Sequence, residues 1–486
     1  MVSLTIEQQE IVDFQGDYLV VNAYAGTGKT TVLNAFASKY SDKQWLYLAF
    51  NRAIRDEAQA SFPSNVECLT SHQLAYRVVG KHYRSKLQNN LSLMEVANEI
   101  KTTDWAYAAV VKRALLYFLA SDSEQLSLEL MEAIPDVPKN LRPIVYHHVL
   151  MLWDNMTNEK HHFPMVHDGY LKLYQLLQPN VSSFCDGILF DEVQDVNAVT
   201  RHIVLNQTVP WVMVGDKHQQ IYRFRGAINA MDHQSICDVP RLALTHSFRY
   251  GPNIAKLASK LLQLKGDTVT LVGMGGKDSV DDLSKTKAIK KHHAILHRTV
   301  AGVIDSALQS VRCYWVGGIN NYRLEDIEDM FWFSVGSRSH IRNKRLVAPF
   351  RDFNHYREVA KEGQDSEMLQ TIKLIDKYPD LPQRLKQLRK QAVREESKAN
   401  ITVSTAHRAK GLEWPIVVIC DDFPHLLEED VDKRDVLSLI DEINLLYVAV
   451  TRSLQTLIIP DSIRQLTINS KKRTELQHFL TQLNQK

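Results

Sequence analysis

The segment at residues 18–40 constrains the fold of this chain more than any other. An apolar run at 18–21 leads into the sequence AYAGTGKT at 23–30, and a helical run follows from 31 to 40. Glycines in such a turn let backbone N–H groups curl around phosphate oxygens, and the next helix adds the positive end of its dipole. A strand, a glycine-rich turn and a helix in this order predict a phosphate-binding loop on a parallel α/β sheet.

The loop carries side chains suited to a nucleoside triphosphate and its metal ion. Lys29 would reach the β- and γ-phosphates, and the Thr30 hydroxyl would ligate Mg²⁺. The alternative is a chance Gly-Lys-Thr triplet, and the first position is Ala23 rather than the glycine of the general pattern. The flanking strand and helix favour the nucleotide site, with expected contacts from Ala25, Gly26, Thr27, Gly28, Lys29, Thr30 and Thr31.

A second apolar run, at 188–190, leads directly into Asp191 and Glu192. A carboxylate at a strand tip can bind the Mg²⁺ held by Thr30, and the adjacent Glu192 can orient and deprotonate an attacking water. Taken alone, a solvated acidic turn explains this pattern equally well. Together with the phosphate-binding loop, it predicts an NTPase in which Asp191 is a metal ligand.

Short β-branched runs alternate with long helical stretches along the chain, which is typical of an α/β fold. Several runs are apolar throughout, as expected for strands buried on both faces of a parallel sheet. The expected strands lie at 18–21, 45–50, 188–190, 211–214, 294–296, 401–404, 416–420 and 457–459. They predict two sheet domains with mainly helical insertions, namely 1–80 with 181–240 around the insertion 81–180, and 241–324 with 396–486 around the insertion 325–395.

Composition limits the partners of the chain. Its 486 residues include 58 Lys and Arg against 56 Asp and Glu, a net charge of +2, and 44% are hydrophobic. These proportions exclude a disordered chain, a collagen and a protein that holds nucleic acid by bulk positive charge. Any DNA contact must therefore use local patches and stacking surfaces.

The remaining composition is consistent with a reducing compartment. Five separated cysteines without a CxxC pair argue against a zinc site and against a disulfide framework. Neither a secretory signal nor an apolar run long enough to span a bilayer is visible. We expect no membrane partner, and a location in the cytoplasm or nucleoid of a prokaryote or in the nucleus of a eukaryote.

An ordered set of motifs resembles one family. The loop at 23–30 and the sequence DEVQD at 191–195 are similar to superfamily 1 DNA helicases of the UvrD/Rep type. The further segments that resemble helicase motifs are, in chain order, 4–9, 48–52, 69–72, 214–227, 247–249, 405–413 and 446–452. Outside these motifs, the segments that resemble the F-box DNA helicases of this family are 62–66, 152–156, 167–173 and 444–447. Because the chain opens on the first motif, we expect the helicase core without an F-box.

The resemblance implies two RecA-like domains with parallel sheets and an ATP site at the cleft between them. The nucleotide contacts it implies are Phe248 on the adenine face, Gln8 on the adenine edge and Glu413 on the ribose. Gln219 would sense the γ-phosphate. Arg249 and Arg452 would contact that phosphate and neutralise charge in the transition state. Outside the motif set, a surface salt bridge would be the ordinary interpretation of such arginines.

The resemblance also implies a path for single-stranded DNA across both sheets. Tyr222 and Phe224 are two residues apart, so on extended backbone they share a face on which bases can stack. Ordinary core packing is the alternative, and the flanking polar and basic residues favour DNA. The expected DNA contacts are Phe50, Asn51, Thr70, His72, Tyr222, Phe224, Arg225 and His407.

Two basic clusters lie in the second insertion, one formed by Arg338, Arg342, Lys344 and Arg345 and the other by residues 384–390. A solvated helix face and a contact with duplex phosphates both remain open for them.

We therefore expect a monomeric, ATP- and Mg²⁺-dependent helicase that moves 3′→5′ on single-stranded DNA and separates duplex, in DNA repair or recombination control. The direction of movement follows from the resemblance alone. The alternatives that stay open are a DNA-stimulated ATPase that displaces recombinase filaments or recruits a partner with little unwinding of its own, a helicase of a phage-defence complex that works with a separate nuclease, and an RNA substrate. The partners considered are single-stranded DNA and its junctions with duplex, together with recombinase filaments or single-strand-binding protein.

Overall fold

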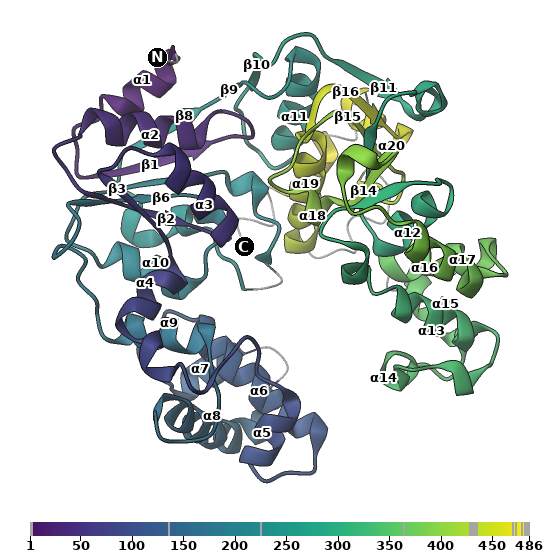
Figure 1. The fold of residues 1–486 in the computed structure, drawn as a ribbon, viewed down its shortest axis with the longest axis horizontal. Helices are drawn as coiled ribbons and strands as arrows, with labels where there is room; N and C mark the ends of the chain where they lie inside the picture. The colour runs from purple at the N-terminus through teal and green to yellow at the C-terminus, as the bar shows by residue number, and fades with distance from the viewer. Residues whose placement is uncertain are drawn as a thin grey trace. The chain divides into compact units, whose positions relative to one another are not determined.

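The computed structural model describes residues 3–134, 137–223, 226–362, 365–426, 436–468, 471, 474–477 and 480. The chain divides into two compact units, residues 1–23 with 28–244, and residues 24–27 with 245–486. Each unit contains a six-stranded sheet (Figure 1), and neighbouring strands in both sheets are parallel, which confirms the predicted α/β class. Within the described residues, no helix combines the length and apolar character needed to cross a membrane.

The sheet of the first unit has the strand order β3-β2-β6-β7-β1-β8. Its strands are β1 (Tyr18–Ala23), β2 (Trp45–Ala49), β3 (Val66–Thr70), β6 (Gly187–Phe190), β7 (Trp211–Gly215) and β8 (Arg241–Leu244). The sequence predicted β1, β2, β6 and β7. It missed β3, whose apolar run is broken by the exposed Glu67, and the edge strand β8, which begins with the exposed Arg241.

Helices cover both faces of this sheet. Successive residues of β1 point to opposite sides, so Leu19 and Val21 join the core under α1 (Ile6–Val12), α2 (Lys29–Lys39) and α3 (Arg52–Ser61). Val20 joins the core on the other face, which includes α10 (Ala198–Leu205). Figure 1 shows α2 and α10 on opposite sides of the strands.

Between β3 and β6 the chain forms a mainly helical insertion. Its elements are α4 (Ser71–Val78), α5 (Leu93–Glu99), α6 (Trp105–Ala120), α7 (Leu128–Ala133), α8 (Arg142–Thr157) and α9 (His167–Leu176), with the short strands β4 (Leu87–Gln88) and β5 (Met165–Val166). One buried apolar cluster includes Val20 and Phe190 of the sheet together with Phe118 and Leu152 of the insertion. Because apolar burial is continuous, the insertion and the sheet share one core.

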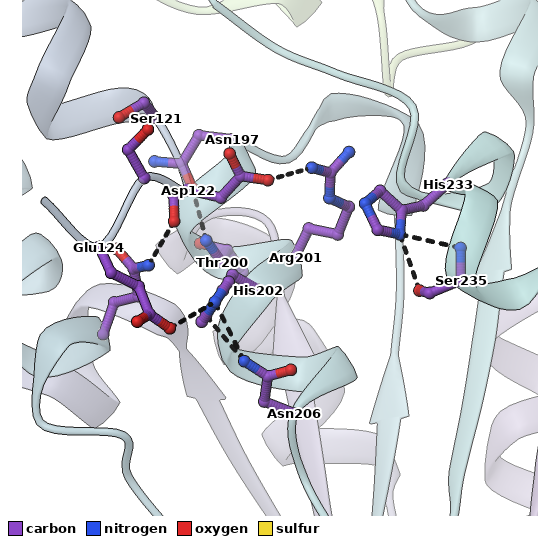
Figure 2. Close-up of polar contacts among 12 residues, drawn as sticks. Ser121, Asp122, Glu124, Asn197, Thr200, Arg201, His202, Asn206, His233 and Ser235 are labelled. Carbon is purple, nitrogen blue, oxygen red and sulfur yellow. Dashed lines mark hydrogen bonds and ion pairs between the residues drawn. The ribbon is translucent and has the colours of Figure 1, made fainter. Parts of the chain in front are cut away.

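Polar contacts add to this attachment at the edge of the sheet where β1 and β7 begin. Arg201 of α10 donates to the Asp122 carboxylate at the end of α6, and His202 lies 3.5 Å from Glu124 (Figure 2). Tyr18 and Trp211, the first residues of β1 and β7, have their ring centroids 5.0 Å apart beside the same cluster. The contacts lie where the strands begin, at the opposite side of the sheet from the carboxyl ends of the strands. They therefore hold the insertion without occupying the carboxyl ends.

The sheet of the second unit has the order β11-β16-β15-β12-β14-β13. Its strands are β11 (Ser279–Asp282), β12 (His293–His297), β13 (Cys313–Trp315), β14 (Ile401–Thr405), β15 (Trp414–Ile419) and β16 (Ser453–Ile459), and a separate pair consists of β9 (His246–Ser247) and β10 (Val272–Gly273). The sequence predicted β12, β14, β15 and β16, and missed the short strand β13 and the polar edge strand β11.

The second unit also carries a helical insertion, between β13 and β14. Its helices are α13 (Leu324–Ser334), α14 (Lys344–Val347), α15 (Phe353–Glu362), α16 (Ser366–Lys377) and α17 (Leu381–Gln391). Further helices among the described residues of this unit include α11 (Pro252–Leu264), α12 (Val300–Leu308), α18 (Ala406–Ala409), α19 (Val436–Val450) and α20 (Asp461–Ile468).

The basic clusters of this insertion are partly neutralised within it. Arg342 contacts Glu328 at 2.9 Å and the buried Asp329 at 3.2 Å. Arg389 of the other cluster contacts Glu325 at 2.9 Å. These arginines therefore connect α13 to α17 and to the segment before α14, in addition to any role on the surface.

A buried carboxylate organises the carboxyl end of β12. Asp422 accepts hydrogen bonds from the backbone N–H groups of Arg298 (2.9 Å) and Thr299 (3.0 Å) and from the Thr299 hydroxyl (2.7 Å). Burial alone would raise the pKa of Asp422, but these contacts and His297, 3.3 Å away, hold it below the ordinary value of 3.8. The ionised carboxylate therefore stabilises the turn from β12 into α12.

Replacing Asp422 by Ala should lower the free energy of unfolding by about 3 kcal/mol, because buried donors lose their acceptor. The folded pKa is depressed, so the contribution of Asp422 is present at pH values above 3.8 and is lost as the pH falls below it. Denaturant unfolding, with hydrogen exchange of peptides from β12 and α12, measures the change. Asp421→Ala, at the exposed neighbouring position, is the control, and equal effects of the two substitutions would contradict this assignment.

Candidate functional site

The glycine-rich loop follows the carboxyl end of β1. Gly26 and Gly28 have φ values of +76° and +81°, a backbone region that other residues adopt at a cost. A Cβ at Gly26 would lie 2.6 Å from the Ser247 hydroxyl, and one at Gly28 would lie 3.0 Å from the Gln8 amide nitrogen. The loop therefore requires glycine at both positions, and Gln8 lies beside it, where the sequence predicted an adenine contact.

Hydrogen bonds within the second unit, which includes residues 24–27, hold the start of the loop. The Ala25 N–H donates to the Tyr447 hydroxyl (3.1 Å), and the Ser247 hydroxyl donates to the Ala25 carbonyl (2.9 Å). The Phe248 N–H donates to the Gly26 carbonyl (2.8 Å), while the Phe248 side chain remains 44% exposed. An exposed aromatic ring next to the loop is compatible with the predicted stacking on adenine.

Lys29 and Glu192 form an ion pair of 2.8 Å with both side chains largely buried. Burial alone would lower the pKa of Lys29, but the negative charges of Glu192, Asp191 and Asp216 raise it above its usual value. Burial, followed by the charge of Glu192, raises the pKa of Asp191 to about 6. One ammonium thus faces several carboxylates in a largely buried setting, so the site favours an additional cation electrostatically.

The carboxylates stand at the carboxyl end of β6, next to β2. Asp191 is 2% exposed, its Oδ1 accepts the Glu192 N–H (2.8 Å) and its Oδ2 accepts the Tyr47 hydroxyl (2.7 Å). Thr30 lies in the first turn of α2, one residue after Lys29, and is exposed. A carboxylate and a hydroxyl are hard oxygen donors of the kind that Mg²⁺ prefers, so this donor set fits the predicted metal.

Glu192 is part of a network that reaches Gln219. Its φ of +51° is a left-handed conformation that costs a non-glycine residue about 1–3 kcal/mol. The Gln194 amide donates to the Glu192 carboxylate, and its carbonyl oxygen accepts the Asp216 N–H (3.0 Å). Gln219 then donates to the Asp216 carboxylate (2.8 Å). The two predicted catalytic groups Glu192 and Gln219 are therefore coupled through buried hydrogen bonds.

In the second unit, two of the predicted nucleotide contacts face one another. The Arg249 guanidinium donates to the Glu413 carboxylate (2.6 Å) and to the Thr451 carbonyl (3.3 Å). Arg452 is 1% exposed, and its guanidinium donates to the backbone carbonyls of Val448 (2.9 Å) and Leu412 (3.3 Å). A phosphate contact by either arginine would thus replace or supplement contacts that it makes within its own unit.

A cavity of about 600 Å³ in the first unit gathers four of the predicted DNA contacts, namely Phe50, Asn51, Thr70 and His72. Phe50 is 40% exposed, and its ring is stacked on that of Tyr222, with centroids 6.3 Å apart and an interplanar angle of 11°. The insertion contributes His167 and Tyr170 to the cavity wall, which the sequence did not predict. Aromatic and polar groups in one open cavity can stack and hydrogen-bond bases.

Three of these cavity residues also make contacts within the first unit, and the remaining predicted DNA contacts lie elsewhere. The Thr70 hydroxyl caps the N-terminus of α4, and the side-chain amide oxygen of Asn51 caps the N-terminus of α3. His72 lies 3.1 Å from Asp168 of α9. His407 lies in α18 of the second unit, and Phe224 and Arg225 fall outside the described residues.

Among the described residues, one group of three side chains could also hold a metal ion, namely Glu99, His161 and His162. His161 Nδ1 accepts the Phe163 N–H (3.1 Å), so the proton of the neutral ring lies on Nε2, which faces Glu99 at 3.6 Å. Glu99 also accepts a hydrogen bond from the Asn155 amide (2.8 Å) and lies 3.1 Å from His162 Nε2, so contacts within the insertion account for the arrangement.

Comparisons with known proteins identify the family of this chain. The family model of the UvrD-like helicase C-terminal domain matches residues 162–462, and that of the UvrD/REP helicase N-terminal domain matches residues 4–234. The chain belongs to the UvrD-like helicase family, which confirms the resemblance and implies two RecA-like domains.

The chain is 31% identical to F-box DNA helicase 1 of Gallus gallus over 511 residues, covering 96% of the chain and 50% of that protein. It is 30% identical to F-box DNA helicase protein 1 of Schizosaccharomyces pombe over 513 residues, covering 95% and 58%. It is 23% identical to a probable DNA helicase II homolog of Mycoplasma genitalium over 403 residues, covering 60% and 56%. The chain thus spans about half the length of the relatives it matches.

Sequence reasoning did not single out Tyr47, Gln194, Ser247 or Tyr447, although all contact the predicted site. Ser247, Tyr447 and Gln194 lie inside the motif segments 247–249, 446–452 and 191–195, so motif membership was the available signal. Tyr47 lies outside every motif. Its one signal was a hydroxyl within an apolar strand.

Replacing Asp191 by Asn should stabilise the metal-free protein at pH 8 by about 1–3 kcal/mol, because the ionised carboxylate is buried beside Glu192. The folded pKa lies above the ordinary 3.8, so ionised Asp191 lowers stability progressively between pH 3.8 and about 6 and fully above that range. The gain should therefore be smaller at pH 5. Denaturant unfolding with a chelator present measures both values, with exposed Asp17→Asn as control. A loss of stability in Asp191→Asn at pH 8 would contradict the expectation.

Proposed function

We propose that this chain is an ATP-dependent DNA helicase that translocates 3′→5′ on single-stranded DNA and separates duplex. The observation that carries the proposal is the placement of Lys29, Asp191 and Glu192 together at the carboxyl edge of the first sheet, in a chain of the UvrD-like family. Family membership supports the direction of movement and a setting in DNA repair or recombination.

We propose that Lys29 binds the β- and γ-phosphates while Thr30 and Asp191 hold Mg²⁺. Bound Mg²⁺ would neutralise charge on the phosphates. Because Lys29 pairs with Glu192 when no phosphate competes, an arriving γ-phosphate would exchange for the Glu192 carboxylate on the ammonium. Glu192 would then be able to take a proton from the attacking water.

Gln219 is proposed to sense the γ-phosphate, since its hydrogen bonds lead back to Glu192 through Asp216 and Gln194. Arg249 and Arg452 are proposed γ-phosphate contacts, and Gln8, Phe248 and Glu413 the base and ribose contacts.

For the domain division we propose that 1–80 with 181–244 and 245–324 with 396–486 are the two motor domains, and that 81–180 and 325–395 are their insertions. The boundary falls after residue 244 rather than after the predicted residue 240, because β8 pairs with β1 of the first sheet. Supporting this division, each insertion lies between two strands of the same sheet, β3 and β6 in the first unit and β13 and β14 in the second. We propose that the cavity containing Phe50 and His72 holds single-stranded DNA.

Unwinding of tailed duplexes tests the function. We expect the protein to separate a 3′-tailed DNA duplex with ATP and Mg²⁺, and to act poorly on a 5′-tailed duplex. Lys29→Ala and Glu192→Gln should each reduce DNA-stimulated hydrolysis by about 100-fold or more, because phosphate binding or water activation is lost. Substantial turnover in both variants, or preferred unwinding of the 5′-tailed duplex, would contradict the proposal.

The same assay separates the alternatives. Hydrolysis stimulated by DNA without strand separation, together with removal of a recombinase filament from DNA, would indicate a filament-displacing ATPase. An RNA duplex tested in parallel distinguishes the substrates.

Replacing Phe50 or Tyr222 by Ala should weaken binding of single-stranded DNA by about 1–3 kcal/mol each, because a base loses an aromatic face. Fluorescence anisotropy with a labelled oligonucleotide measures the loss. Since the two rings are stacked on one another, the double substitution should cost less than the sum of the single ones. The exposed residue Phe184, outside the cavity, provides the control substitution to Ala. Unchanged DNA affinity in both single variants would exclude this cavity as the DNA site.

A further inference from the structure

Tyr47 places a hydroxyl group in the centre of a buried parallel strand. The residue is 0% exposed, and its ring packs against Phe62 with centroids 4.8 Å apart. The other residues of β2 are Trp45, Leu46, Leu48 and Ala49, and all are buried. A phenylalanine would supply the same ring, so the ring alone does not account for the hydroxyl, which is costly to bury without a partner.

The register of the sheet brings that hydroxyl to Asp191. Tyr47 lies opposite Leu189 in the pairing of β2 with β6. Asp191 follows Leu189 by two residues, so the Asp191 side chain points to the same face of the sheet as Leu189 and its partner Tyr47. Two residues along a strand correspond to about 7 Å. A tyrosine side chain that leans along its strand spans this distance, and the hydroxyl donates to Asp191 Oδ2 at 2.7 Å.

Both oxygens of the carboxylate are anchored. Oδ2 accepts from Tyr47, and Oδ1 accepts from the Glu192 N–H at 2.8 Å. Each carboxylate oxygen can accept more than one contact, so each retains capacity for a metal ion. Two donors on different oxygens fix the plane of the Asp191 carboxylate. With the Glu192 N–H as its one donor, the carboxylate could rotate about the hydrogen bond to that N–H.

We propose that Tyr47 is a positioning residue of the metal site, which orients the Asp191 carboxylate for the divalent cation that accompanies ATP. This inference rests on the proposed nucleotide-dependent function of the same site. Groups that orient a metal ligand typically change metal affinity by about 10–100-fold when they are removed.

The test is Tyr47→Phe, which removes the hydroxyl and keeps the ring. Mn²⁺ serves as the probe, and its binding in the presence of ADP is measured by electron paramagnetic resonance, which requires no turnover. We expect the dissociation constant for Mn²⁺ to rise about 10-fold or more, while ADP binding without metal stays unchanged. In ATPase assays, the Mg²⁺ concentration for half-maximal rate should rise similarly, and saturating Mg²⁺ should restore most of kcat.

Tyr83→Phe is the matched control. Tyr83 is also buried in the first unit, and its hydroxyl donates to the Thr157 carbonyl at 2.8 Å, away from the carboxylates. Both variants lose one tyrosine hydrogen bond, so a general loss of stability should affect them alike. Equal Mn²⁺ affinity in Tyr47→Phe and the unaltered protein, or equal weakening in both variants, overturns the inference.

A double substitution tests whether Tyr47 acts through Asp191. Adding Tyr47→Phe to Asp191→Asn should not weaken Mn²⁺ binding further, and a full additional loss overturns the inference.

If the unaltered protein fails to hydrolyse ATP while Tyr47→Phe selectively weakens Mn²⁺ binding, the proposed function fails and the positioning role stands. If hydrolysis is normal and Tyr47→Phe binds Mn²⁺ normally, the positioning role fails and the proposed function stands.

Discussion

The burial of unbalanced charge at the carboxyl edge of the first sheet governs the proposed site. Lys29 interacts with the charges of Asp191, Glu192 and Asp216, and the pKa of Asp191 is raised by burial and by the neighbouring charge of Glu192. Such charges persist in a folded protein only where the surrounding structure holds them. The left-handed backbone of Glu192 is a second local cost at the same place. Both are typical of a site whose electrostatics are arranged for a charged ligand rather than for stability.

The structure sustains these costs through the cores on both sides of the sheet. Apolar residues of the strands pack under α1, α2 and α3 on one face and continue into the helical insertion on the other. The shared core has a functional consequence, since the insertion helix α9 contributes His167 and Tyr170 to the cavity that contains Phe50 and His72. The proposed DNA contacts are thereby drawn from two parts of the first unit that fold on one core.

Much of the fold and of the candidate site could be predicted from the sequence. The central strands were predictable because buried parallel strands are apolar along their whole length, whereas β3, β8, β11 and β13 are short, polar or at an edge. The proposed roles of Lys29, Asp191 and Glu192 were predicted from the motifs in which these residues lie. Their hydrogen-bond partners did not, because the Tyr47–Asp191 contact joins residues 144 positions apart and depends on strand order and register. The pairing of Arg249 with Glu413 was likewise invisible, since both were predicted to contact the nucleotide.

The sequence by itself determined the glycine-rich loop after β1, the carboxylates that follow β6 and membership of the helicase family, because these depend on residue types at short, local spacing. Only the tertiary structure decided that Glu192 pairs with Lys29, that Gln194 connects Glu192 to Asp216, and that Tyr47 reaches Asp191. It also decided that the insertion shares the cavity with the predicted DNA contacts. The physical reason is that a parallel sheet brings together the carboxyl ends of strands that are distant in sequence. At those ends, strand register and side-chain length decide which residues make contact, and no local sequence pattern encodes either of them.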